Sequence, residues 1–136
     1  MHQQFKINYM DNQLQGIMQR IADWSDAQFG EGRSPIPILH HLKKEVPELI
    51  EAIENYQELS LNENGAKETE IALKKVLFEY ADCFMLILDS ARTMGLNSEM
   101  LYTYTNWKLE INKNRQWGIP DENGVVEHIR DAVSEI

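Results

Sequence analysis

Residues 76–88 read Val-Leu-Phe-Glu-Tyr-Ala-Asp-Cys-Phe-Met-Leu-Ile-Leu, and this stretch decides the fold. It carries only two charges, Glu79 and Asp82. A helix that is apolar nearly all round is expected to be buried on most sides, and residues three apart share one face of it. An ionised carboxylate is costly to bury without a partner. The pair therefore needs either basic side chains from another helix or a bound cation, and we favour the cation.

Outside this stretch, the few Gly and Pro residues separate long segments with helical periodicity. These segments cover about 11–29, 36–59, 66–94 and 97–117. Gly95 is well placed to end the third segment. No run of strict alternation is long enough to predict a sheet, although residues 124–126 form a candidate short extended piece. We predict an all-α, four-helix antiparallel bundle with a short irregular C-terminal tail, forming a single domain over residues 1–136.

The composition narrows the classes of partner. With 22 acidic and 13 basic residues the formal charge is −9, which argues against binding to nucleic acid. The same charge suits a protein that holds divalent metal. A single cysteine, Cys83, excludes an internal disulfide and a Cys-based zinc site. No membrane span or signal peptide is visible, so we expect a cytoplasmic protein with no membrane partner.

The second segment offers a matching pair of acids, Glu45 and Glu48. Turning each residue by about 100° places Glu45 at the border of an apolar stripe, with Glu48 and His41 on the same flank. The other glutamates of this segment point to the opposite side, toward solvent: Glu51, Glu54 and Glu58. Pro47 lies inside the pair, so either the helix kinks there or it begins near Pro47.

These two pairs form a ligand set made only of oxygen, which hard cations such as Mg²⁺ prefer. A di-iron centre would need Glu-x-x-His pairs, and the chain has none. His41 is either a contact to the metal ligands or substrate, or a packed histidine. A metal held by the acids would activate a water, with Glu45 or Glu48 orienting or deprotonating it.

Further candidates are polar and aromatic. Lys108, Asn112 and Arg115 follow each other at helical spacing and could bind phosphate oxygens, although basic residues near a helix end usually face water. Trp24 and Phe29 precede a glycine-rich loop and are candidates for stacking on a base, or else core residues. Metal ligands and a phosphate clamp together are typical of a site for a nucleoside polyphosphate.

The acidic pairs resemble the signature of the MazG-like all-α nucleoside triphosphate pyrophosphatases. The chain is most similar to their dATP/dGTP pyrophosphohydrolase branch, which phages and bacteria often encode. Four stretches carry this similarity over residues 20–129: Trp24 with Phe29-Gly30, His41 to Leu49, Glu79-Tyr-Ala-Asp-Cys-Phe, and Asn112-Lys-Asn-Arg115-Gln-Trp-Gly118.

The resemblance implies cleavage of dATP or dGTP between the α and β phosphates, dependent on Mg²⁺ with Mn²⁺ as a substitute. It implies a homodimer or homotetramer working in the cytoplasm of a bacterial or phage-infected cell. The metal ligands it implies are Glu45, Glu48, Glu79 and Asp82, and the phosphate ligands are Lys108, Asn112 and Arg115. Two alternatives remain open: the same fold acting on a pyrimidine or non-standard nucleotide, and a non-catalytic adaptor whose acidic pairs are structural.

Overall fold

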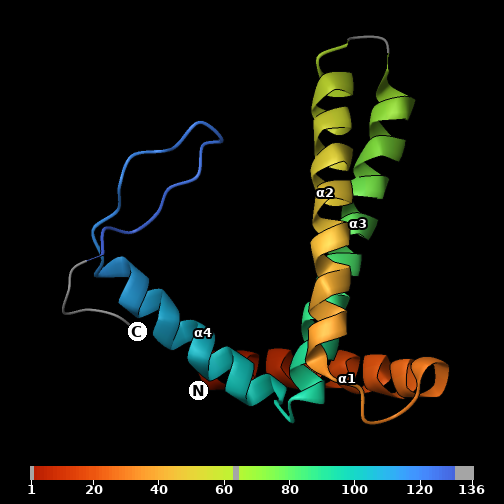
Figure 1. Ribbon diagram of the computed structural model, residues 1–136, viewed down its shortest axis with the longest axis vertical. Coiled ribbons are helices and arrows are strands. Elements are labelled where there is room, and N and C mark those ends of the chain that lie inside the picture. The colour runs from red at the N-terminus through yellow and green to blue at the C-terminus, as the bar shows by residue number, and fades with distance from the viewer. Residues whose placement is uncertain (1, 63–64, 131–136) are drawn as a thin grey trace. The chain divides into compact units, whose positions relative to one another are not determined.

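The computed structural model describes the backbone of residues 2–62 and 65–130, and the side chains of residues 13–62 and 65–130. Within these residues it contains four helices and no strand, which confirms the predicted all-α class (Figure 1). The helices are α1 (His2–Phe29), α2 (Pro35–Ser60), α3 (Ala66–Thr93) and α4 (Ser98–Lys113). None of the described helices is both long enough and apolar enough to cross a membrane.

The chain divides into two compact units, Met1–Ser98 and Glu99–Ile136. In the first unit, α2 and α3 lie side by side as an antiparallel hairpin, and α1 packs against α3 near the open end of that hairpin (Figure 1). Small side chains such as Ala52 and Ala72 are buried where the helices meet, so the two backbones can approach closely. The buried apolar side chains are Met18, Ile21, Ile38, Ala52, Ala72, Val76, Cys83 and Leu88.

Local sequence sets the start of α2 and the end of α3. Ser34 is the N-cap of α2, and its Oγ accepts a hydrogen bond from the Ile36 N–H at 3.3 Å. A proline in the first turn of α2 fits because its missing N–H has no partner there in any helix. Gly95 follows the last residues of α3 with φ of +77°, the left-handed conformation expected of a glycine that ends a helix.

The helix α2 runs through Pro47. The alternative in which the helix begins near Pro47 is therefore wrong. A proline inside a helix costs about 3 kcal/mol through a lost hydrogen bond and a clash. The N-cap and the packing of α2 along α3 offset that cost, and they keep Glu45 and Glu48 on one continuous helix.

Within the first unit by itself, residues 76–88 are not buried on most sides, in contrast to the expectation from the sequence. Val76, Cys83 and Leu88 are buried, but several large apolar side chains of the stretch are exposed. The exposed set is Leu77, Phe78, Tyr80, Phe84, Met85 and Ile87. The physical reason is that α3 has only α1 and α2 packed against it within the first unit.

The second unit consists of α4 and the segment that follows it. That segment folds back on itself through one antiparallel bridge between Trp117 and His128, with the Gly118 N–H donating to the Glu127 carbonyl at 2.8 Å. The turn between them is held by Asp121, whose Oδ1 accepts from the N–H groups of Asn123 and Val125. Residues 124–126 do not form a strand, so the short extended piece is not found there.

Candidate functional site

Three glutamates from two helices converge in the first unit. Glu45 and Glu48 come from α2 and Glu79 from α3, and one carboxylate oxygen of each lies within 4.8 Å of the other two. The antiparallel pairing of α2 and α3 produces this convergence, since it brings the middle of each helix beside the other. The structure thus brings together three of the four acids that the sequence predicts as metal ligands.

Glu79 is the most enclosed of the three. Its side chain is 14% exposed, and Oε1 lies 3.8 Å from the Lys75 Nζ, one turn away on the same helix. Oε2 is buried and has no hydrogen-bond partner among the described residues. A buried acceptor left without a partner is unusual in a folded protein and calls for a ligand. A cation bound here would supply the missing partner.

Glu45 and Glu48 differ in their surroundings. The His41 Nε2 lies 2.8 Å from the Glu45 Oε1, and the His41 ring is largely exposed, so His41 is not a packed core histidine. A hydrogen bond shared with Glu45 raises the pKa of Glu48, with the Glu45 charge and partial burial acting in the same direction. Lys75 and His41 act in the opposite direction. The Glu48 carboxyl therefore lies within hydrogen-bonding reach of the Glu45 carboxyl.

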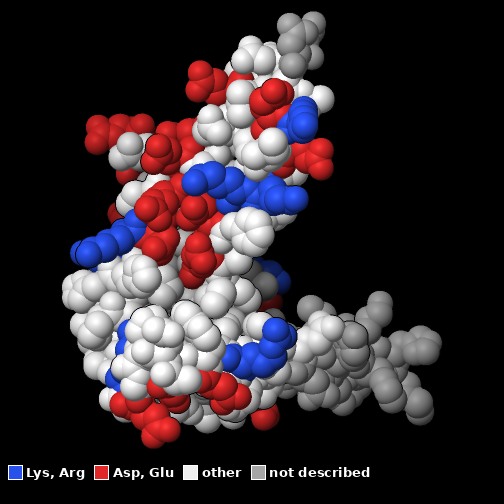
Figure 2. Space-filling model, turned by 90° about the vertical axis from the view of Figure 1, so that its right-hand side faces the viewer, with Lys and Arg blue, Asp and Glu red and all other residues white. Residues whose placement is uncertain are grey.

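Lys75 is the basic side chain that forms an ion pair with this cluster among the described residues, and it lies on the same helix as its partner Glu79. Within the described part of the first unit, no Lys or Arg from another helix forms an ion pair with Glu45, Glu48 or Glu79. Figure 2 shows Asp and Glu side chains gathered over the α2–α3 hairpin. This accumulation of negative charge favours the interpretation in which a cation is bound.

Asp82 lies outside the cluster. It is exposed on α3, one turn beyond Glu79, and it does not belong to the group of converging carboxylates. The remaining glutamates of α2, which the sequence predicts to face solvent, are all exposed: Glu51, Glu54 and Glu58. The role of Asp82 as a fourth metal ligand stays a prediction.

The two aromatic candidates lie together at the end of α1. The rings of Trp24 and Phe29 are in an edge-to-face arrangement with centroids 5.5 Å apart, and about half of each side chain is exposed. The guanidinium of Arg33 lies over the Phe29 ring, 4.8 Å from its centroid. Trp24 and Phe29 are thus not core residues, and an exposed aromatic face beside a cation is suited to stacking on a planar ligand.

A buried polar network behind this aromatic pair is not predicted from the sequence. Ser25, which the helical spacing places on the inner stripe of α1, is fully buried and donates to the Asp89 Oδ2 at 2.8 Å. The Arg92 Nε donates to the Asp89 Oδ1 at 2.7 Å, and its Nη1 to Asp26 at 2.6 Å. The one signal in the sequence is that Asp89 ends an otherwise apolar run, since an acid there needs a partner.

In the second unit, the predicted stripe of Lys108, Asn112 and Arg115 is only partly helical. The helix α4 ends at Lys113, so Arg115 lies in the turn that follows. Its Nη1 donates to the Asn112 Oδ1 at 3.1 Å, which keeps the two side chains together. The Asn112 carbonyl accepts from the Trp117 Nε1 at 3.1 Å, so Asn112 links the helix end to the folded-back segment.

His128 is a further member of this basic group that the sequence does not single out. Its ring packs edge-on against Trp117, with centroids 6.0 Å apart. Burial, followed by the charges of Arg115, Arg130 and Lys108, lowers the pKa of His128, and Glu127 alone acts in the other direction. Several cations of the second unit therefore lie near one another although the protein as a whole is acidic.

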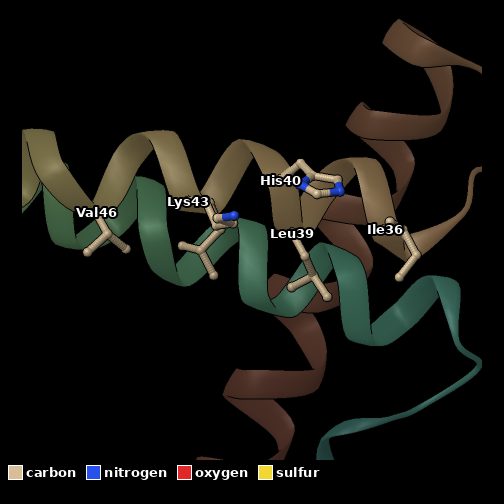
Figure 3. Close-up of a pocket in the computed structure, with 6 residues that line it drawn as sticks. Ile36, Leu39, His40, Lys43 and Val46 are labelled. Atoms are coloured by element: carbon tan, nitrogen blue, oxygen red, sulfur yellow. The ribbon is translucent and has the colours of Figure 1, made fainter.

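One side of α2 carries a shallow apolar hollow of about 430 Å³. Figure 3 shows Ile36, Leu39 and Val46 along this side of the helix, together with the more polar His40 and Lys43. Leu39 and Val46 are apolar, yet both are exposed. The surface of the hollow is almost entirely apolar although His40 and Lys43 lie beside it, so it resembles a contact surface more than a pocket for a small ligand.

Helices that bring several carboxylates together define an all-α protein with a candidate centre for a hard divalent cation. The dATP/dGTP pyrophosphohydrolase family model matches residues 63–135, slightly more than half of the chain. The chain belongs to this family. The matched region includes Glu79, Asp82 and the basic residues of the second unit, while Glu45 and Glu48 lie before it.

The chain is also similar to the Eaa protein of Salmonella phage P22, with 36% identity over 58 residues. This similarity covers 43% of the chain and only 18% of the phage protein. No solved structure matches the chain.

Proposed function

We propose that this protein is a Mg²⁺-dependent hydrolase that cleaves dATP or dGTP between the α and β phosphates, releasing a nucleoside monophosphate and pyrophosphate. Family membership supports a pyrophosphohydrolase of dATP and dGTP. The observation that carries the proposal is the buried, unpartnered Glu79 Oε2 beside two further carboxylates.

The donor set fits Mg²⁺, because it consists of carboxylate oxygens with an unsatisfied, buried acceptor among them. Glu45, Glu48 and Glu79 would hold the ion, with Asp82 as the fourth proposed ligand and Mn²⁺ as a substitute metal. When bound, the metal neutralises charge on the triphosphate and lowers the pKa of water.

The protein's own carboxylates handle the proton in this proposal. Attack of water on the α-phosphorus forms a new P–O bond and breaks the bond to the bridging oxygen, and Glu45 or Glu48 accepts the proton that the water gives up. The close approach of His41 to Glu45 orients that carboxylate. Little covalent work falls to the protein, so positioning and electrostatics account for the rate.

Binding of the substrate falls to two further groups of residues. Lys108 and Arg115 offer charged donors to phosphate oxygens, and Asn112 holds Arg115 in position through its Oδ1. Trp24 and Phe29 would stack on the base. The proposed partner is therefore a purine deoxynucleoside triphosphate.

We further propose that the protein is a homodimer or homotetramer. The side chains of α3 that are exposed in the single chain include large aromatic and aliphatic residues such as Phe78 and Phe84. Exposed patches of large apolar side chains often mark protein–protein contacts. A second copy of the same chain presents a matching apolar face.

A screen of the natural dNTPs and NTPs for pyrophosphate release tests the proposed reaction. We expect release from dATP and dGTP that requires Mg²⁺ or Mn²⁺, with the product nucleotide appearing as the monophosphate. The variant Glu79→Gln should abolish release while its helicity stays near that of the wild type, and Glu51→Gln on the exposed side of α2 serves as the matched control. Normal turnover by Glu79→Gln would show that Glu79 is not a metal ligand.

Thermal unfolding separates an enzyme from a non-catalytic adaptor. A ligand that binds only the folded state stabilises it by about 2.7 kcal/mol at a concentration one hundred times its Kd. We expect Mg²⁺ with dATP or dGTP to raise the Tm, whereas the Tm of an adaptor with structural acidic pairs would not respond. Release from a pyrimidine or non-standard nucleotide alone would move the assignment to another substrate within the same fold.

A further inference from the structure

The guanidinium of Arg33 is held in place from behind. Its Nη1 donates to the Ser25 Oγ at 3.1 Å and lies 3.6 Å from the Asp89 Oδ2. Ser25 is fully buried and Asp89 is 5% exposed, so both anchors are part of the protein interior. Asp89 is itself fixed by Arg92, which donates to its other oxygen. Arg33 therefore has an orientation set by rigid, buried groups rather than by solvent.

The opposite edge of the guanidinium is available to a ligand. Among the described residues, Nε and Nη2 of Arg33 make no hydrogen bond, and neither is among the buried unpaired nitrogens. The guanidinium lies against the exposed Phe29 ring, which in turn packs on Trp24. The two rings are nearly perpendicular, so a planar ligand would stack on one of them, with the free N–H donors of Arg33 beside it.

The charge of the network indicates what kind of ligand group fits this edge. Arg33 and Arg92 face Asp26 and Asp89, so the formal charges of the network cancel. A neutral network with two aligned donors is suited to neutral acceptors rather than to phosphate. Guanine offers two adjacent acceptors, O6 and N7, to a bidentate arginine, whereas adenine offers N7 beside an amino donor.

We propose that Arg33 is a specificity residue that binds the O6/N7 edge of guanine, held in position by Ser25 and Asp89. This inference rests on the proposed function, since it assigns one purine to the proposed site at Trp24 and Phe29. It predicts that dGTP is preferred over dATP. A good bidentate pair discriminates against the wrong base by about 1–3 kcal/mol, which corresponds to a factor of about 5 to 150 in kcat/KM.

The test compares kcat/KM for dGTP, dATP and 7-deaza-dGTP, the last of which lacks the N7 acceptor. For the wild type we expect dGTP to exceed both other nucleotides by about tenfold. In Arg33→Gln the three values should converge, with the loss falling mainly on dGTP, and Arg33→Lys should not restore the preference because a lysine lacks the fork. Arg20→Gln, an exposed arginine of α1, should keep the wild-type ratios.

The outcomes separate this inference from the proposed function. If the wild type cleaves dGTP and 7-deaza-dGTP equally, or if Arg33→Gln keeps the wild-type ratio, Arg33 does not contact the base, and the pyrophosphohydrolase assignment stands. If the wild type cleaves neither purine nucleotide, the pyrophosphohydrolase assignment fails. The contact between Arg33 and guanine is then tested by nucleotide binding instead of turnover. Stronger thermal stabilisation by dGTP than by dATP, lost in Arg33→Gln, then supports the contact, and equal stabilisation overturns it. The 7-deaza comparison uses the wild type alone, so a folding defect of a variant does not affect it.

Discussion

Glu79 shows how a single residue can carry a functional assignment. Its Oε1 lies 3.8 Å from the Lys75 Nζ on the same helix, and its Oε2 has no hydrogen-bond partner among the described residues. A carboxylate in that position lowers the stability of the fold unless something positive compensates for it. The residue thus makes sense as part of a centre that is completed by a ligand.

His128 provides a test of the proposed phosphate contacts in the second unit. Burial and the charges of Arg115, Arg130 and Lys108 lower its pKa, so protonation below about pH 6.5 is harder in the folded than in the unfolded state. The resulting stability is present above that pH and is lost as the pH falls through the lowered value. Phosphate bound to Lys108 and Arg115 would neutralise part of that positive charge.

We therefore expect pyrophosphate to raise the pKa of His128, measured by NMR titration at constant ionic strength. The His128 signal is assigned by its disappearance in His128→Asn. In Lys108→Ala the rise should be smaller, because one of the proposed ligands is gone. A pKa of His128 that does not respond to pyrophosphate would argue against phosphate binding by this basic group.

At the residue scale, the sequence predicts the converging acids well because helical geometry is regular. A rotation of about 100° per residue suffices to select Glu45 and Glu48 from five glutamates on one helix. Periodicity within one segment carries no information on partners far apart in the chain. The pairing of Ser25 with Asp89, 64 residues later, and the position of Arg33 over Phe29 therefore appear only in the structure.

At the scale of the helices, glycines mark which positions are helical and which are not. Gly16 lies inside α1, whereas Gly95 ends α3 with φ of +77°. A Cβ added at either glycine would lie more than 4 Å from every atom outside its own stretch of backbone, so packing does not contribute to the effect of a substitution. The backbone conformation at each glycine alone decides whether the substitution raises or lowers the free energy of unfolding.

We expect Gly16→Ala to stabilise the protein by about 0.5–1 kcal/mol, because alanine loses less conformational freedom in a helix. Gly95→Ala should destabilise it by about 1–2 kcal/mol, because a left-handed conformation brings a Cβ too close to the backbone. Denaturant unfolding of both variants beside the wild type measures the two values. Equal effects of the same sign would show that one of the two helix assignments is wrong.

The positions of the helices are also predictable in large part, because most of the few glycines and prolines lie at or near helix ends. The second and third helices begin and end within a residue or so of the predicted bounds, since Pro35 and Gly95 lie at their ends. The first helix extends well beyond the predicted start at residue 11, and the fourth ends at Lys113, before the predicted limit at Gly118. No proline or glycine marks either of these two boundaries.

At the scale of the whole molecule, the exposed apolar face of α3 is the feature that a single chain leaves unexplained. Sequence patterning predicts that these residues are buried, and patterning does not distinguish burial within a chain from burial between chains. The single domain over residues 1–136 also stays a prediction. Self-association would reconcile the pattern with the structure.

We expect the wild type to elute as a dimer or tetramer, and Phe84→Asp to shift it toward the monomer. Full burial of a Phe side chain contributes about 1.5–3 kcal/mol, so its loss should weaken association by about tenfold or more. Light scattering coupled to size-exclusion chromatography gives the mass directly. The control is Leu61→Asp, an apolar residue just after α2 that is more exposed than Phe84. A monomeric wild type, or an equal response to both substitutions, would contradict the proposed interface.

The central claim is that Glu45, Glu48 and Glu79 jointly hold a divalent cation, and a calorimetric titration with Mn²⁺ or Mg²⁺ in the absence of nucleotide tests it most directly. We predict saturable binding by the wild type and by the control Glu51→Gln. Glu79→Gln should bind at least about tenfold more weakly, since even partners of metal ligands contribute a factor of ten or more. Equal affinity in the wild type and Glu79→Gln, or no binding by the wild type, would contradict the account.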